Sequence, residues 1–231
     1  MAGHPASVTS RQTQTHTILR RSGILVVSVM VMGVGVTLLL LARLGVVPID
    51  VLHLGVAHAI GLGYGGGVIV VQVILLLSGL PLKVHIGPAT VVAFLIPALT
   101  ADLLLTVLPS PEGVVARIVV FVAGGALFCA GVAGYLTAKL GQLPRDGLMV
   151  VLGRGRPRRT AIVRIMLDLG FVAVGAVLLG PAAAVHQGIL SVGTVVLALT
   201  CGPVIAKLSV TLSRVSAAST RSRDAVAKVA P

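Results

Sequence analysis

The sequence predicts an all-α polytopic membrane protein. We expect about six transmembrane helices, arranged as two inverted three-helix repeats, each with a short PxD half-helix or re-entrant segment. Three observations lead to this fold class. Of the 231 residues, 56% are hydrophobic and 10% are charged, and the mean hydropathy is +1.09, whereas soluble domains carry about 25% charged residues. The apolar residues form long runs, and a GxxPxDxL motif occurs twice.

The apolar runs define the expected elements in order. A polar, basic segment at 1–21 predicts a disordered cytoplasmic tail. The run at 22–42 matches the ~20 residues needed to cross a bilayer. Further spans are expected at 64–80, 86–108, 114–138, 162–180 and 188–212. These runs are uniformly apolar, whereas the strands of a membrane barrel alternate apolar and polar residues.

The spans group into two membrane repeats, at 22–108 and 114–212. An external loop at 109–113 joins them, a basic cytoplasmic loop lies at 139–161, and a basic cytoplasmic tail follows at 213–231. With six spans and both termini inside, only Arg43 and Arg117 of the 18 Lys and Arg residues lie outside. This agrees with the excess of Lys and Arg in cytoplasmic loops. Residues 48–63 fall below the length of a full span, so they predict a re-entrant hairpin or a surface helix, with a short extra crossing as the alternative.

The repeated motif reads GVVPIDVLHLG at 45–55 and GQLPRDGLMVV at 141–151. The matching positions are Gly45, Pro48 and Asp50 in the first copy and Gly141, Pro144 and Asp146 in the second. A second short match, TVV, occurs at 90–92 and at 194–196. Three spans per repeat place the two copies in opposite orientations, a plan that recurs in transporters. We interpret PxD as a helix start, because Pro and Asp both suit the first helical turn. A gating or ligand-binding role is the alternative.

Four polar residues inside the spans are candidates for a substrate or ion pathway: Asp168, Arg164, Asp102 and Gln72. Asp168 lies about six residues, or ~9 Å, into the fifth span, where a carboxylate requires a partner. Arg164 is one helical turn away and is the expected partner, so the pair is either an internal ion pair or part of a site. Asp102 has no basic residue one turn away. Gln72 is interpreted as an interhelical hydrogen-bonding residue or a ligand.

Other chemistry is not expected. The sequence contains no Ser/His/Asp set, CxxC pair or HExxH motif, so we expect neither an enzyme nor a cofactor. His53 and His58 are five residues apart and lie on different helical faces, so we expect no metal site. Cys129 and Cys201 lie in apolar runs and are interpreted as packing residues. The basic residues lie between and beside the spans, which argues against nucleic acid as a partner.

Several stretches resemble the YczE/YitT family of bacterial integral membrane proteins. They are GVVPIDVLHLGVAHAIGLG, LPRDGLMVVLGR, the stretch from Arg164 to Asp168, and SVGTVVLALTCGP. The resemblance covers about residues 22–212. It implies a multi-pass protein of the bacterial plasma membrane, in a family with no settled biochemical activity.

The leading hypothesis is therefore a small-molecule or ion-coupled transporter or exporter whose solute is unknown. The alternative is a non-transporting accessory or scaffold protein that acts through its basic cytoplasmic loop. That loop could also contact anionic lipid head groups. The expected partners are the lipid bilayer, a small solute, and either a second copy of the chain or another membrane protein.

Overall fold

The computed structural model describes residues 6–82, 87–141, 143–154 and 156–229. Within these ranges the chain forms α-helices and no β-strands. The helices are α1 (Ala6–Ala42), α2 (Pro48–Ile60), α3 (Tyr64–Gly79), α4 (Pro88–Val107), α5 (Val114–Ala138), α6 (Pro144–Leu152), α7 (Pro157–Leu179), α8 (Pro181–His186) and α9 (Val192–Val229).

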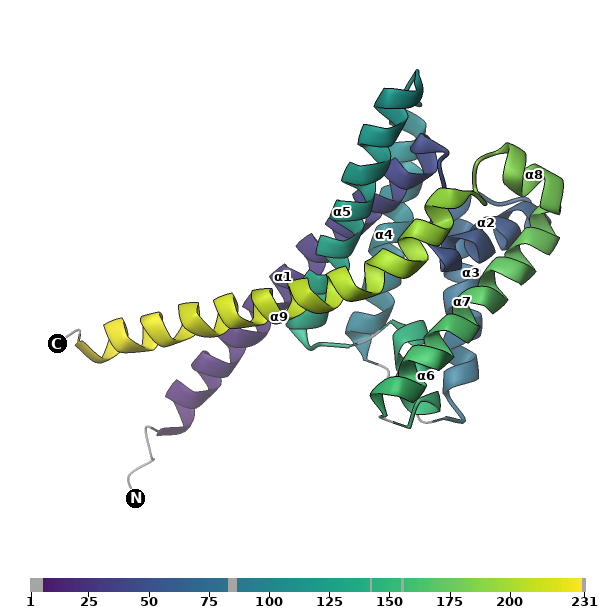
Figure 1. Cartoon of the computed structure of the whole chain (residues 1–231). Helices are drawn as coiled ribbons and strands as arrows, with labels where there is room; N and C mark the ends of the chain where they lie inside the picture. Colours follow the sequence, from purple (N-terminus) through teal and green to yellow (C-terminus); the bar gives the residue numbers. More distant parts are fainter. Residues whose placement is uncertain (1–5, 83–86, 142, 155, 230–231) are drawn as a thin grey trace.

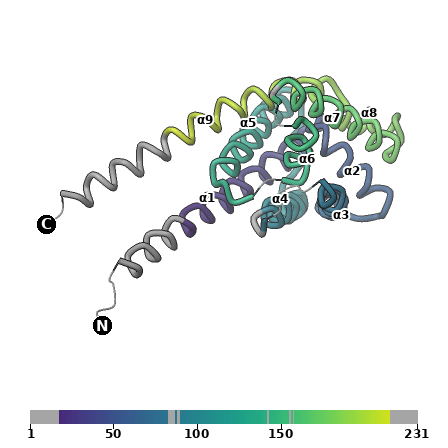
Figure 2. Tube along the Cα trace, turned by 90° about the horizontal axis from the view of Figure 1, so that it is seen from below, coloured from purple at the N-terminus to yellow at the C-terminus, as the bar shows by residue number. Residues whose placement is uncertain are grey.

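Five of these helices are long and apolar enough to cross a membrane: α1, α4, α5, α7 and α9. The sixth predicted span corresponds to α3, which has 16 residues. It passes the same test only together with α2, and the two are bent by 108° at the break between them. In Figure 2, α3 is seen almost end-on while α2 runs across the view. The chain is thus a multi-pass membrane protein with five or six spans.

The first and last helices extend beyond the predicted spans. α1 begins at Ala6, so most of the tail predicted to be disordered continues the first helix. α9 likewise continues from the last span to Val229. Once a helix has formed, each added residue gains a backbone hydrogen bond without a new nucleation step. α1 begins and α9 ends on the same side of the bundle (Figure 1).

The most extensive contact between two helices is that of α1 and α5, which run antiparallel (Figure 1). Two glycines allow this close approach: Gly35 faces the backbone of Phe128, and Gly131 faces the backbone of Met32. A methyl group at either position would clash with that backbone. Small residues at such contacts are typical of membrane helices, where association depends on close packing.

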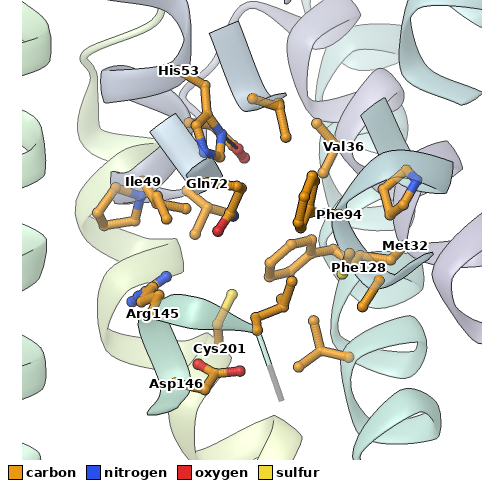
Figure 3. A pocket seen from close by; sticks show the side chains of 18 of the residues that line it. Met32, Val36, Ile49, His53, Gln72, Phe94, Phe128, Arg145, Asp146 and Cys201 are labelled. Carbon is orange, nitrogen blue, oxygen red and sulfur yellow. Dashed lines mark hydrogen bonds and ion pairs between the residues drawn. The ribbon is translucent and has the colours of Figure 1, made fainter. Parts of the chain in front are cut away.

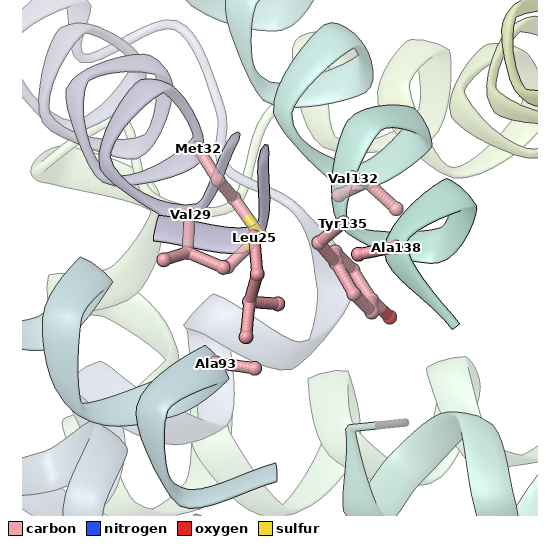
Figure 4. Close-up of a cluster of buried hydrophobic side chains, with 7 residues drawn as sticks. All are labelled: Leu25, Val29, Met32, Ala93, Val132, Tyr135 and Ala138. Carbon is pink, nitrogen blue, oxygen red and sulfur yellow. The ribbon is translucent and has the colours of Figure 1, made fainter. Parts of the chain in front are cut away.

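α4 packs on α1, and α9 packs on α5. Figure 4 shows where α1, α4 and α5 meet: Leu25, Val29 and Met32 from α1 face Ala93 from α4 and Val132, Tyr135 and Ala138 from α5. The outward faces of the same helices expose large apolar side chains, among them Val115, Leu103 and Leu199. An apolar exterior of this extent suits contact with lipid.

The two PxD helices lie at opposite ends of α7. Gly55 of α2 contacts Gly175, near the end of α7, and Gly153, just after α6, contacts Thr160 at its start. Both helices begin at the proline of their motif. Figure 1 shows α2 and α6 separated along the length of α7.

The end of α1 is held by residues from the second half of the chain. Arg117 donates from Nε to the carbonyl of Ala42 at 2.7 Å and from Nη2 to that of Arg43 at 2.8 Å. The hydroxyl of Ser191 donates to the carbonyl of Leu44, and the amide of Val46 donates to the hydroxyl oxygen of Thr194 at 3.3 Å. The bonds to the carbonyls satisfy acceptors that the end of α1 leaves without intrahelical partners, and the bond from Val46 fixes the segment that leads into α2.

Candidate functional site

A cavity of about 270 Å³ lies inside the bundle. Every helix except α8 contributes to its lining. Figure 3 shows His53 at one end and Asp146 at the other, with Phe94, Phe128 and Gln72 between them. The lining therefore has two polar ends and a largely apolar middle.

One polar end is the Asp50 cluster, which consists of Asp50, His53 and Tyr64. Asp50 lies in the first turn of α2, and His53 follows one turn later. Asp50 Oδ1 accepts hydrogen bonds from His53 Nδ1 at 2.9 Å and from the Tyr64 hydroxyl at 2.8 Å. Asp50 and His53 are each 3% exposed, so this carboxylate is almost completely removed from solvent.

The other polar end is the Asp168 cluster, which consists of Asp168, Arg145, Arg164, Asp146 and Tyr135. Asp168 Oδ1 is bonded to Arg145 Nη2, and its Oδ2 lies 3.8 Å from Arg164 Nε. The Tyr135 hydroxyl donates to Asp146 Oδ2. Both arginines thus pair with Asp168, while Asp146 is held by a tyrosine, so the cluster contains two arginines and two aspartates.

Four buried polar atoms have no hydrogen-bond partner in the described part of the chain: Asp50 Oδ2, His53 Nε2, Gln72 Oε1 and Arg145 Nε. All four belong to residues that line the cavity. A buried polar group left unpaired costs about 1–3 kcal/mol. Most such groups in proteins are therefore paired with protein or water, and the concentration of these four around one cavity is typical of a ligand site.

The structure brings together most of the residues expected from the sequence. Asp168, Arg164 and Gln72 line the cavity, together with Pro48, Asp50 and Asp146 from the repeated motif. The remaining motif residues lie outside the lining. Pro144 is fully buried at the start of α6, Gly141 precedes that helix, and Gly45 has a φ of +124° and packs against the backbone at Thr194.

Asp102 lies outside the cavity lining. Its Oδ1 accepts a hydrogen bond from the amide of Gly65 at 2.7 Å. Gly65 is in the first turn of α3, where backbone N–H groups have no intrahelical acceptor and the helix dipole favours a negative charge. Asp102 therefore caps α3 from the neighbouring α4.

Arg145, Tyr64 and Tyr135 are site residues that the sequence interpretation missed. Helical spacing finds partners on the same helix, but Arg145 reaches Asp168 from α6. The signal available in the sequence was the rarity of aromatic side chains, because the chain has only two tyrosines and no Trp. In the structure, each tyrosine is bonded to the aspartate of one PxD motif. Among the residues that the structure describes, no group of His, Cys, Asp and Glu could hold a metal ion.

The chain is similar to proteins of two bacteria. It is 30% identical over 182 residues to an uncharacterised protein of Haemophilus influenzae, covering 79% of this chain and 80% of the relative. It is 26% identical over 160 residues to the uncharacterised protein YyaS of Bacillus subtilis, covering 67% of this chain and 79% of the relative. No solved structure matches significantly.

The match to a family model assigns the chain to a family. The more specific resemblance to the YczE/YitT family stays a prediction. Residues 19–209 match the model of a family of unknown function, DUF6198. This match includes both PxD motifs, three of the five candidate spans in full, and most of the first and last spans. The chain therefore belongs to the DUF6198 family.

Proposed function

We propose that this chain is a carrier in the bacterial plasma membrane that moves a small solute through the central cavity. The observation that carries the proposal is the cavity itself. It places three aspartates and two arginines inside a bundle of apolar helices. Ionisable groups at such positions are costly and are usually functional.

An inverted repeat would support a carrier function. The packing of the helices in the two halves of the chain fits an inverted repeat. If α1 corresponds to α5, and α4 to α9, then each first helix packs on the last helix of its own half. In both halves the two helices run in parallel: Gly33 meets Pro97 and Thr100, and Gly125 meets Leu197. The two first helices run antiparallel to each other. α2 packs on α7 and α6 on α3, which are also equivalent pairs.

The two polar clusters lie at opposite ends of the cavity (Figure 3). In an alternating-access carrier a central site opens first to one face and then to the other. We infer that the Asp50 cluster lies toward the outer face and the Asp168 cluster toward the cytoplasm, with both termini cytoplasmic. Breaking the contacts of one cluster at a time would open the cavity from one side only.

Flux through reconstituted protein tests the carrier function. Proteoliposomes would be challenged in turn with radiolabelled small amines, carboxylates and sugars, while solute uptake, transmembrane current and luminal pH are recorded. We expect one solute class to give a response that Asp168→Asn abolishes, because Arg145 and Arg164 then lose their shared carboxylate. Arg158→Gln is the matched control, since Arg158 is exposed and lies outside the cavity.

The carrier proposal does not depend on one variant. Gln72→Leu replaces a cavity amide by an apolar side chain of similar size and leaves no charge unpaired. This variant should therefore fold even if Asp168→Asn does not. A wild-type protein that gives no solute uptake, no current and no pH change with any solute class would contradict the proposal. The same holds if both cavity variants respond as strongly as the wild type.

The exposed arginines of the basic loop favour a second candidate, a membrane scaffold. Arg154, Arg156, Arg158 and Arg159 are exposed around the start of α7. Arg145 belongs to the same loop by sequence but is committed to the cavity. A partner that co-purifies with the wild type, and is lost when these four arginines become glutamines, would favour this function over transport.

A further inference from the structure

The carboxylate of Asp50 has no arginine or lysine partner among the described residues. Both arginines of the cavity lining pair with Asp168, at the other polar end. Among the described residues, the ion pair of Asp50 is with His53 alone. The Asp50 end of the cavity therefore offers a carboxylate without a guanidinium or ammonium partner.

The unpartnered atoms at this end are hydrogen-bond acceptors. Asp50 Oδ2 and Gln72 Oε1 are oxygens without a donor. When His53 Nδ1–H donates the hydrogen bond to Asp50, Nε2 of the neutral ring is a third acceptor. The three side chains are 3–4% exposed, so they are shielded from bulk solvent. A ligand that satisfies this end must bring N–H or O–H groups.

The middle of the cavity is apolar. Phe94 and Phe128 face the space between the two polar ends, and Met32, Val36 and Ile49 complete it (Figure 3). Aromatic faces attract cations and also bury apolar groups. A volume of about 270 Å³ is at the small end of ligand sites, which limits the occupant to a compact organic molecule.

From these features we propose that the cavity binds a small protonated amine with an apolar body. The ammonium group donates to Asp50 Oδ2 and Gln72 Oε1, and the body packs against Phe94 and Phe128. An ammonium supplies three donors and a positive charge, and a charge-assisted hydrogen bond is about twice as strong as a neutral one. This inference rests on the proposed carrier function and names the class of its solute.

Calorimetric titration of the purified full chain tests the inference with three ligands that share one apolar body: 2-phenylethylammonium, 2-phenylethanol and 3-phenylpropionate. We expect saturable binding of the cation, at least about tenfold tighter than that of the alcohol or the anion, which corresponds to ~1.4 kcal/mol. This comparison uses wild-type protein only. Equal or tighter binding of the alcohol or the anion, or no saturable binding of the amine, would overturn the inference.

Variants place the ammonium within the cavity. Asp50→Asn should weaken binding of 2-phenylethylammonium at least about tenfold, since it removes the carboxylate that faces the ammonium. Glu112→Gln is the matched control, because it removes an exposed carboxylate outside the cavity, and should alter the affinity by less than about threefold. Gln72→Leu should weaken binding and covers the case in which Asp50→Asn does not fold. Loss of binding in Glu112→Gln with retention in Asp50→Asn would contradict the placement.

The outcome is separable from the carrier function. Flux of a carboxylate or a sugar, without amine binding, would refute the inference and leave the carrier proposal intact. Amine binding without flux of any solute would support the site and refute the carrier.

Discussion

Asp168 has two arginine partners, and the structure ranks them differently from the sequence. Helical spacing selects Arg164, one turn away on α7. In the structure, Arg145 Nη2 is bonded directly to Asp168 Oδ1, and both side chains are 12% exposed. Arg164 Nε lies 3.8 Å from Oδ2, and its side chain is 31% exposed. We therefore predict that Arg145 couples more strongly to Asp168 than Arg164 does.

The burial of each pair sets the expected magnitudes. Removing one partner of a buried ion pair costs about 3–5 kcal/mol, because the other charge stays buried without compensation. At 12% exposure the lower end applies, so Arg145→Gln and Asp168→Asn should each destabilise the protein by about 3 kcal/mol. Arg164→Gln should cost about 1 kcal/mol or less, as for an ion pair near solvent.

The chain carries its own reporter for this measurement. Cys129 and Cys201 are its only cysteines, and both are free and buried. A maleimide dye that becomes fluorescent on reaction with thiols therefore reports unfolding as the protein is heated in detergent. We expect the double variant Arg145→Gln/Asp168→Asn to be destabilised by less than the sum of its single variants, with a coupling of about 2 kcal/mol.

The same double-mutant cycle with Arg164 provides the comparison. Its coupling should be within about 0.5 kcal/mol of zero. If the Arg164 cycle gave the larger coupling, or if Arg145→Gln left the melting temperature unchanged, the assignment of Arg145 as the main partner would be wrong.

Two further predictions concern packing and orientation. Gly175→Ala should destabilise the protein by about 1–3 kcal/mol, because its new methyl group meets the backbone of α2. Gly170→Ala, on the same helix with nothing nearby, should be neutral or slightly stabilising, and equal melting temperatures would refute the close α2–α7 contact. In a variant without the native cysteines, Leu62→Cys and Arg154→Cys place exposed thiols next to the ends of α2 and α6. A membrane-impermeant maleimide should label Leu62→Cys on intact cells and Arg154→Cys only after permeabilisation, whereas labelling of both on the same side would rule out the inverted repeat.

Most of the helices were predictable because each of them depends on a local signal, whereas α8 falls between two expected spans and was not predicted. Continuous apolar runs mark the spans, and a proline at the first helical position marks the starts of α2 and α6. The number of spans was less determined. α3 has 16 residues, so its membrane depth depends on how α2 bends against it, which composition does not encode.

The site was only partly predictable because its contacts cross between helices. An acid inside a span signals that a partner exists, but i, i+4 spacing identifies partners on one helix alone. Arg145 approaches Asp168 from 23 positions away. Asp102 shows a different limit of the sequence. It was expected to be a pathway residue because it is an acid inside a span, but in the structure it caps a neighbouring helix.

The bonds at the end of α1 have a consequence for biosynthesis. The carbonyl of Leu44 and the amide of Val46 are bonded to residues 147 and 148 positions later in the chain. During translation the first helices enter the bilayer before those residues have been made. The nascent first half must therefore persist with an incomplete helix end, and the ribosome has to synthesise the start of α9 before that end can close. A chain truncated before Ser191 should accordingly be a target for membrane proteases, even though most of its spans are already present.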